Sequence, residues 1–98
     1  MIDRLSPREI RSLEQSLARG DAWPRVILGC FVEGERLLLG IDRARTESEI
    51  AAAARLEPAA ARAVIAEAAR FCEAHGLHLL GFPEDDAGRE WRHFMAVG

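Results

Sequence analysis

An alanine-rich stretch between two helix boundary signals constrains the fold of this chain more than any other feature. Residues 51–74 contain twelve alanines, and alanine is the best helix former although it buries little surface. Thr46-Glu47-Ser48-Glu49 has the pattern of a capping box, and Pro58 interrupts the stretch. Gly76 fits a left-handed helix end. The stretch therefore predicts a short helix over about 50–56 and a longer helix over 58–75, packed closely together.

A second capping signal lies near the start of the chain. Ser6-Pro7-Arg8-Glu9 combines a capping serine, a proline at the first helical position and a glutamate three residues after the serine. Apolar residues then recur at helical spacing, and Gly20 follows as a stop. These signals predict a helix over about 7–19.

Residues 25–41 form two apolar runs on either side of Glu33-Gly34-Glu35, which reads as a hairpin turn. Gly29 and Gly40 weaken a helix but suit bent strands, so we expect two strands here. A helical reading of 25–32 remains open, because a short apolar run has no periodicity that separates the two.

Two further strands are expected at 77–82 and 90–97, joined by a polar loop over 83–89. The fold class is therefore α+β, in the order helix-strand-strand-helix-helix-strand-strand. With 98 residues the chain matches one domain, which we expect to cover residues 1–98.

Composition narrows the classes of function. All thirteen basic residues are arginine, which indicates a GC-rich bacterial genome, and the net charge of −3 argues against strong non-specific binding of nucleic acid. No apolar run is long enough to span a membrane, and the first residues lack the apolar core of a signal peptide. Two cysteines, Cys30 and Cys72, make no disulfide framework. A cytoplasmic location is expected.

Residues 46–97 resemble the winged helix-turn-helix superfamily: a capped short helix, a brief turn, a longer helix and a two-stranded hairpin or wing. The positions that pack together in that superfamily are apolar here: Ile50, Ala51, Leu56, Ala61, Val64 and Ile65. The resemblance implies a DNA-binding regulator. In that reading Arg62 contacts bases, and four other arginines contact phosphates, namely Arg43, Arg45, Arg55 and Arg92.

The chain also departs from that superfamily. The DNA-facing positions of the second helix are mostly alanine, Arg55 stands where the turn usually has glycine, and the wing carries Glu84-Asp85-Asp86. Alanine supplies no hydrogen bond to a base, and phosphates repel acidic side chains. The order of elements also fits a type II KH domain, but Arg55-Leu56-Glu57-Pro58 lacks the GXXG loop of that family.

Candidate chemistry is sparse. Cys72, His75 and His78 have the spacing C-x-x-H-x-x-H, which is not a standard zinc-finger pattern and lacks a fourth ligand. We expect Cys72 in the core, His75 at a helix end and His78 on a polar strand face. In the last strand, alternation places Trp91 and His93 on one face and Arg92 and Phe94 on the other, either as core anchors or as a platform for single-stranded nucleic acid.

The acidic loop is read as a solvated turn, and neither a serine triad nor a glycine-rich phosphate loop is present. We therefore expect no catalytic residue, cofactor or metal. The leading hypothesis is a non-catalytic adaptor or regulatory module that binds a protein partner, including another copy of itself. The alternative is a winged-helix regulator that binds DNA through the five arginines.

Overall fold

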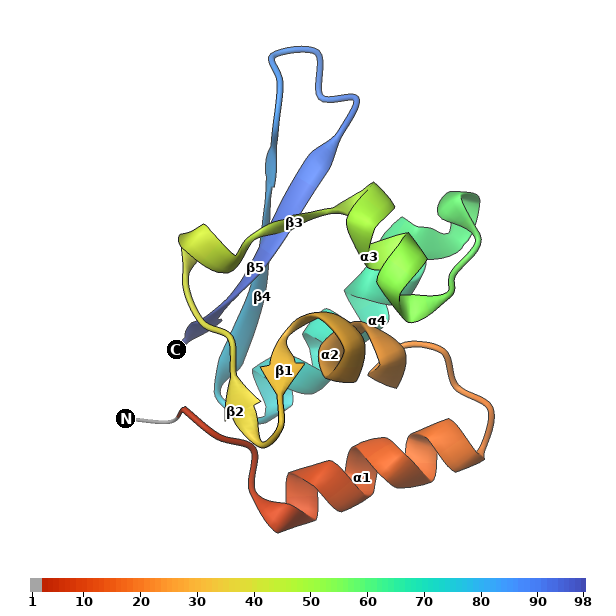
Figure 1. Ribbon diagram of the computed structural model, residues 1–98, viewed down its shortest axis with the longest axis vertical. Coiled ribbons are helices and arrows are strands. Elements are labelled where there is room, and N and C mark those ends of the chain that lie inside the picture. The colour runs from red at the N-terminus through yellow and green to blue at the C-terminus, as the bar shows by residue number, and fades with distance from the viewer. Residues whose placement is uncertain (1–2) are drawn as a thin grey trace.

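The computed structural model describes residues 3–98 and contains four α-helices and two small antiparallel sheets within that range (Figure 1). The helices are α1 (Pro7–Ala18), α2 (Pro24–Cys30), α3 (Glu47–Ala54) and α4 (Ala61–Ala74). The strands are β1 (Val32–Glu33), β2 (Arg36–Leu37), β3 (Arg45–Thr46), β4 (Leu77–Pro83) and β5 (Trp91–Val97), and the 3₁₀ turns are η1 (Ile41–Arg43) and η2 (Pro58–Ala60).

Both predicted capping boxes are confirmed. Ser6 Oγ accepts a hydrogen bond from the backbone of Glu9 at 3.2 Å, and the Glu9 carboxylate accepts one from the backbone of Ser6 at 2.8 Å. Thr46 and Glu49 repeat this exchange at the start of α3, at 3.0 and 2.8 Å. Each box satisfies backbone N–H groups that a helix start leaves without partners.

The expected strand over the first apolar run is wrong, and the helical alternative left open for 25–32 is confirmed, because residues 24–30 form helix α2. Pro24 begins this helix, and Pro24, Val26, Ile27 and Cys30 are all buried. Gly29 is helical as well, so it does not bend a strand. The hairpin at Gly34 does exist, with strands of only two residues each. The KH-type order, which also required a strand in this run, is not observed.

The larger sheet has the order β3-β5-β4, and all of its pairs are antiparallel. Helices α3 and α4 lie between β3 and β4 in the sequence. The turn between these helices passes through Arg55, which has a left-handed backbone with φ of 57°. Gly76 ends the α4 region with φ of +76°, as predicted. Strands β4 and β5 pair over seven residues each, and the predicted strands at 77–82 and 90–97 are confirmed.

The core lies between the helices and the inner face of the sheet. Its largest fully buried side chains include Leu13 of α1, Ile27 of α2, Ile50 of α3 and Met95 of β5. Burying each such side chain contributes about 1.5–3 kcal/mol, so the core holds the helices against the sheet. Among the helices of residues 3–98, none combines the length and apolar character needed to cross a membrane.

Substitution of Ser6 by alanine tests the first capping box. We expect Ser6→Ala to lower the free energy of unfolding by about 1 kcal/mol, because the Glu9 N–H loses its acceptor. Urea unfolding measures the change. Ser6→Asp is the matched control, since it restores an acceptor and stays close to the wild type. If the alanine variant is as stable as the wild type, the box does not stabilise α1.

Candidate functional site

A shallow apolar groove lies between α4 and the inner face of β4 and β5, and we call it the α4–β5 groove. Its volume is about 290 Å³. Apolar side chains from both layers line it, and Glu47 of α3 adds a charged group to the lining. The lining residues are Glu47, Arg62, Ile65, Ala66, Ala69, Leu79, Gly81, Trp91 and His93.

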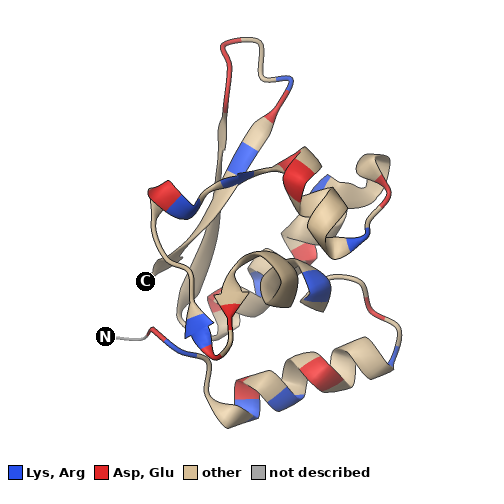
Figure 2. Cartoon of the chain, viewed as in Figure 1, with Lys and Arg blue, Asp and Glu red and all other residues tan. Residues whose placement is uncertain are grey.

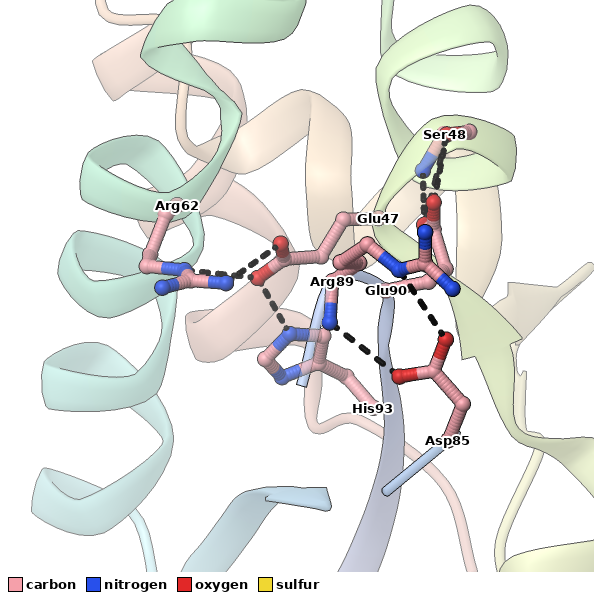
Figure 3. Close-up of polar contacts among 7 residues, drawn as sticks. All are labelled: Glu47, Ser48, Arg62, Asp85, Arg89, Glu90 and His93. Carbon is pink, nitrogen blue, oxygen red and sulfur yellow. Dashed lines mark hydrogen bonds and ion pairs between the residues drawn. The ribbon is translucent and has the colours of Figure 1, made fainter. Parts of the chain in front are cut away.

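Glu47 joins three elements at the rim of this groove (Figure 3). As the first residue of α3, its carboxylate accepts hydrogen bonds from Nε and Nη2 of Arg62 in α4, at 3.3 and 3.1 Å. The same carboxylate lies 2.9 Å from Nε2 of His93 in β5. The side chains of Glu47 and His93 are only 16% and 12% exposed, so solvent screens their contact little.

The environment of Glu47 favours its charged form. Burial raises the pKa of this carboxyl group, but the hydrogen bonds and charges of Arg62 and His93 lower it by more. The net pKa lies below the ordinary value of 4.5. The carboxylate is therefore ionised at neutral pH and holds both partners in place.

Gly81 makes room for His93 in this arrangement. The two residues are directly opposite in the β4–β5 ladder, and a Cβ atom at position 81 would lie 2.8 Å from the imidazole ring. The ring therefore occupies space that any other residue would fill. The guanidinium of Arg62 also lies over the ring of Trp91, 5.6 Å from its centroid, in a cation–π contact.

The structure does not gather the five arginines of the DNA-binding hypothesis on one surface. Arg62 is paired with Glu47, and Arg92 is paired with Glu84 at 2.7 Å. Arg43 lies in η1 and Arg45 in β3, while Arg55 lines a different hollow between α1, α2 and α3. Figure 2 shows positive charge spread over many elements and interleaved with negative charge.

The acidic loop of the hairpin is partly neutralised within itself. Asp85 forms an ion pair with Arg89 at 3.7 Å and accepts a hydrogen bond from the backbone of Arg89 at 3.1 Å (Figure 3). Glu84, the residue before Asp85, forms an ion pair with Arg92. The loop is exposed, as predicted for a solvated turn.

The cysteine and histidine residues with possible metal-binding spacing each have different surroundings. Cys72 is buried in the core, where desolvation raises the pKa of its thiol to about 12. His75 Nδ1 lies 3.0 Å from the carboxylate of Glu9, and its ring packs against Phe71. His78 lies on β4. Burial also raises the pKa of the Cys30 thiol. Within residues 3–98, no group of three or more His, Cys, Asp or Glu residues could hold a metal ion.

A larger hollow of about 450 Å³ lies beside the short hairpin, lined by Glu33, Arg36, Leu37, Leu38, Leu39 and Arg43. In the part of the chain that the structure describes, its charged side chains form no ion pairs. The α4–β5 groove differs because interlocking contacts fix its polar groups. We therefore take the groove as the candidate functional site.

Sequence reasoning identified Arg62 but missed the groove around it. The alternation in β5 correctly placed Trp91 and His93 on one face. No local signal indicated that Glu47, fifteen positions before Arg62, would meet both Arg62 and His93, because that contact depends on how α3 packs against α4 and the sheet.

The role of Glu47 can be tested by its pH dependence. We expect Glu47→Gln to lower the free energy of unfolding by about 1 kcal/mol at pH 7, because hydrogen bonds to a charged acceptor are lost and Arg62 remains partly solvated. The folded-state pKa is depressed, so the carboxylate stabilises the protein above pH 4.5. This contribution disappears as the pH falls through the folded pKa. Urea unfolding at pH 7.0, 5.0 and 3.5 measures this, and the difference in free energy of unfolding between the wild type and Glu47→Gln should shrink as the pH falls.

The control for this series is Glu67→Gln, which removes an exposed carboxylate of α4 that forms no ion pair within residues 3–98. We expect that variant to follow the wild type at each pH. A difference between Glu47→Gln and the wild type that does not change with pH would contradict the assigned role of the carboxylate.

Comparison of the chain with models of protein families, with curated proteins and with solved structures finds no match. The groove is therefore interpreted from its own geometry, namely an apolar hollow with a rim of charges that are paired internally.

Proposed function

We propose that this protein is a non-catalytic interaction module that binds a partner protein through the α4–β5 groove. One observation carries the proposal: Ile65, Ala66, Ala69, Leu79 and Trp91 line an open hollow, and the charged groups beside it are already paired. Centres of protein interfaces are apolar, depleted in unpaired charge and rich in aromatic residues.

The size of the groove supports a protein partner over a small molecule. Pockets for small ligands usually have volumes of about 300–1,000 Å³ and enclose most of the ligand. The groove, at about 290 Å³, is slightly smaller and is open to solvent along one side. It suits a single bulky apolar side chain presented by another chain, which is how anchor residues bind in protein interfaces.

The polar groups of the groove support binding rather than catalysis. A carboxylate beside a histidine occurs in catalytic triads, but such a triad also needs a nucleophile. None of the residues that line the groove in residues 3–98 is Ser, Thr, Cys or Lys. Ser48, which follows Glu47, instead donates to the carboxylate of Glu90 at 3.2 Å (Figure 3).

A winged-helix-type framework is part of this proposal. The sheet order β3-β5-β4, with α3 and α4 between β3 and β4, supports it. So does the left-handed turn at Arg55, where the superfamily usually has glycine. In such a framework α4 is the helix that reads DNA. Its outward residues here include Ala63 and Ala66, Ala59 lies in the preceding turn η2, and Arg62 is engaged by Glu47, so this region offers few groups for bases.

DNA binding is the second candidate function, favoured by the same sheet order and helix positions. Its phosphate contacts would come from Arg43, Arg45 and Arg92, which lie on η1, β3 and β5. Both η1 and β3 contact β5. The pairing of Arg92 with Glu84 and the acidic hairpin loop both weaken the attraction to phosphates.

A peptide library tests the groove directly. The probe is a phage-displayed library of random twelve-residue peptides, panned on the immobilised protein. We expect enrichment of peptides that carry one bulky apolar residue. Ala66→Arg fills the groove from an exposed position on α4 and should weaken these peptides at least about 10-fold, since burying one apolar side chain is worth about 1.5–3 kcal/mol.

Ala63→Arg is the matched control, because it places the same side chain on the exposed surface of α4 without lining the groove. It should bind the selected peptides as the wild type does, and circular dichroism should show that both variants are folded. Failure to enrich any peptide, or equal binding by the two variants, would refute the groove as the interaction site.

The DNA hypothesis makes a separate prediction. If it holds, a pool of random-sequence DNA duplexes shifts in a gel at 20 mM NaCl, and the affinity falls steeply with salt, with a logarithmic slope of about −0.9 for each phosphate contacted. Arg43→Ala should then reduce that slope by about one contact. Under the proposed function we expect no shift, and a salt-sensitive shift would favour DNA binding instead.

A further inference from the structure

A second hollow, formed by α1, α2 and α3, shares no lining residue with the α4–β5 groove, and we call it the arginine hollow. Helix α2 contacts both α1 and α3 (Figure 1). The volume of the hollow is about 310 Å³. Its lining residues are Leu17 of α1, Arg25, Leu28 and Gly29 of α2, Ala53 and Ala54 of α3, and Arg55 directly after α3.

The charged side chains that line the arginine hollow are both positive. Arg25 and Arg55 are exposed, and neither forms an ion pair within residues 3–98. None of the lining residues in that range is Asp or Glu. The chain as a whole has a net charge of −3, so this hollow is a local exception. Two unpaired positive charges beside one hollow attract an anion.

Apart from the two arginines, apolar residues line the arginine hollow. Leu17 and Leu28 are half-buried, so part of each side chain remains open to an occupant. Sites for small ligands have mainly apolar walls and a few polar groups that fix the orientation of the ligand. At roughly 30 Å³ for each non-hydrogen atom in a liquid, the hollow holds about ten such atoms.

The backbone at Arg55 supports a role for its side chain. Its φ of 57° is left-handed, and within residues 3–98 it is the one non-glycine residue with a positive φ. Glycine adopts this conformation without strain and is the usual residue in this conformation at a helix end. Strained residues of this kind cluster at functional sites and ligand clamps. An unpaired arginine at a position that suits glycine better therefore points to a ligand for its guanidinium.

We propose that the arginine hollow binds a small amphiphilic anion, independently of the α4–β5 groove. The carboxylate or phosphate head pairs with Arg25 and Arg55, because a guanidinium binds both kinds of group with two parallel hydrogen bonds. The apolar body lies against Leu17 and Leu28. The groove differs, since its charged side chains are paired with one another and leave no free charge to orient a small ligand.

Titration with sodium octanoate, followed by amide ¹H–¹⁵N spectra at pH 7, tests the proposal. Octanoate has a carboxylate head and about the ten non-hydrogen atoms that the hollow holds. We expect saturable shifts at residues 17, 25–29 and 53–55. Octanamide, which has the same size but no charge, should bind about 10-fold more weakly, because both arginine contacts are lost.

Inorganic phosphate is the second comparison, since it carries the charge without an apolar body. It should also bind at least about 10-fold more weakly than octanoate, because no apolar surface is buried. Octanamide or phosphate that binds as tightly as octanoate overturns the proposal. Octanoate shifts centred on the α4–β5 groove, or an absence of saturable shifts, overturn it as well.

Variants of the two arginines test the assigned contacts. Arg25→Gln and Arg55→Gly should each weaken octanoate about 3-fold, and the double variant about 10-fold. Arg55→Gly should keep or raise the midpoint of urea unfolding, because glycine accepts the left-handed backbone, so its loss of binding does not come from unfolding.

Arg11→Gln is the matched control, because it removes an exposed arginine of α1 that does not line the hollow and forms no ion pair within residues 3–98. It changes the net charge by the same amount and should bind octanoate as the wild type does. A folded double variant with wild-type affinity, or an equal loss in Arg11→Gln, refutes the arginine hollow as an anion site.

Discussion

Burial of helix α2 is the constraint on which the rest of this structure depends. Four of its seven residues are buried, and α1, α3 and α4 all contact it. The approach of α3 is especially close, because a Cβ atom at Gly29 would lie 3.4 Å from the carbonyl oxygen of Ala53. A Cβ atom at that distance would make an ordinary van der Waals contact, so α2 and α3 pack closely at this position without a clash. Packing against α2 thus helps to set the position of α3, whose first residue, Glu47, belongs to the groove.

The geometry of the candidate site depends on this packing. Glu47 is the first residue of α3, and it follows directly from β3, so its backbone is fixed both by the helix and by a strand paired with β5. Its carboxylate then reaches Arg62 on the neighbouring helix and His93 on the neighbouring strand. The groove is therefore a product of tertiary structure, because its rim comes from three elements that no single segment of the sequence contains.

This origin explains which features could be predicted from the sequence. Capping at Ser6 and Thr46 depends on residues three positions apart, and β5 alternation depends on residues two apart, so both were predicted correctly. The sequence of helix α2 does not separate a strand from a helix, because a helix buried on several sides loses the periodicity that marks an amphipathic one. The partner of Arg62 could not be predicted either, since the distance to Glu47 depends on the angle between two helices and on the left-handed turn at Arg55.

Position 81 is a glycine, and its lack of a side chain matters for the groove beside it. The imidazole of His93 lies 2.8 Å from the place that a Cβ atom at position 81 would take, so alanine there forces the ring, which contacts Glu47, to shift. The ladder between β4 and β5 uses backbone atoms and tolerates such a change, because β-strands accept most residues. A single substitution at position 81 can therefore disturb the groove while the sheet stays intact. Glycine at position 81 therefore serves the groove, through the space that it leaves for His93, and not the pairing of the two strands.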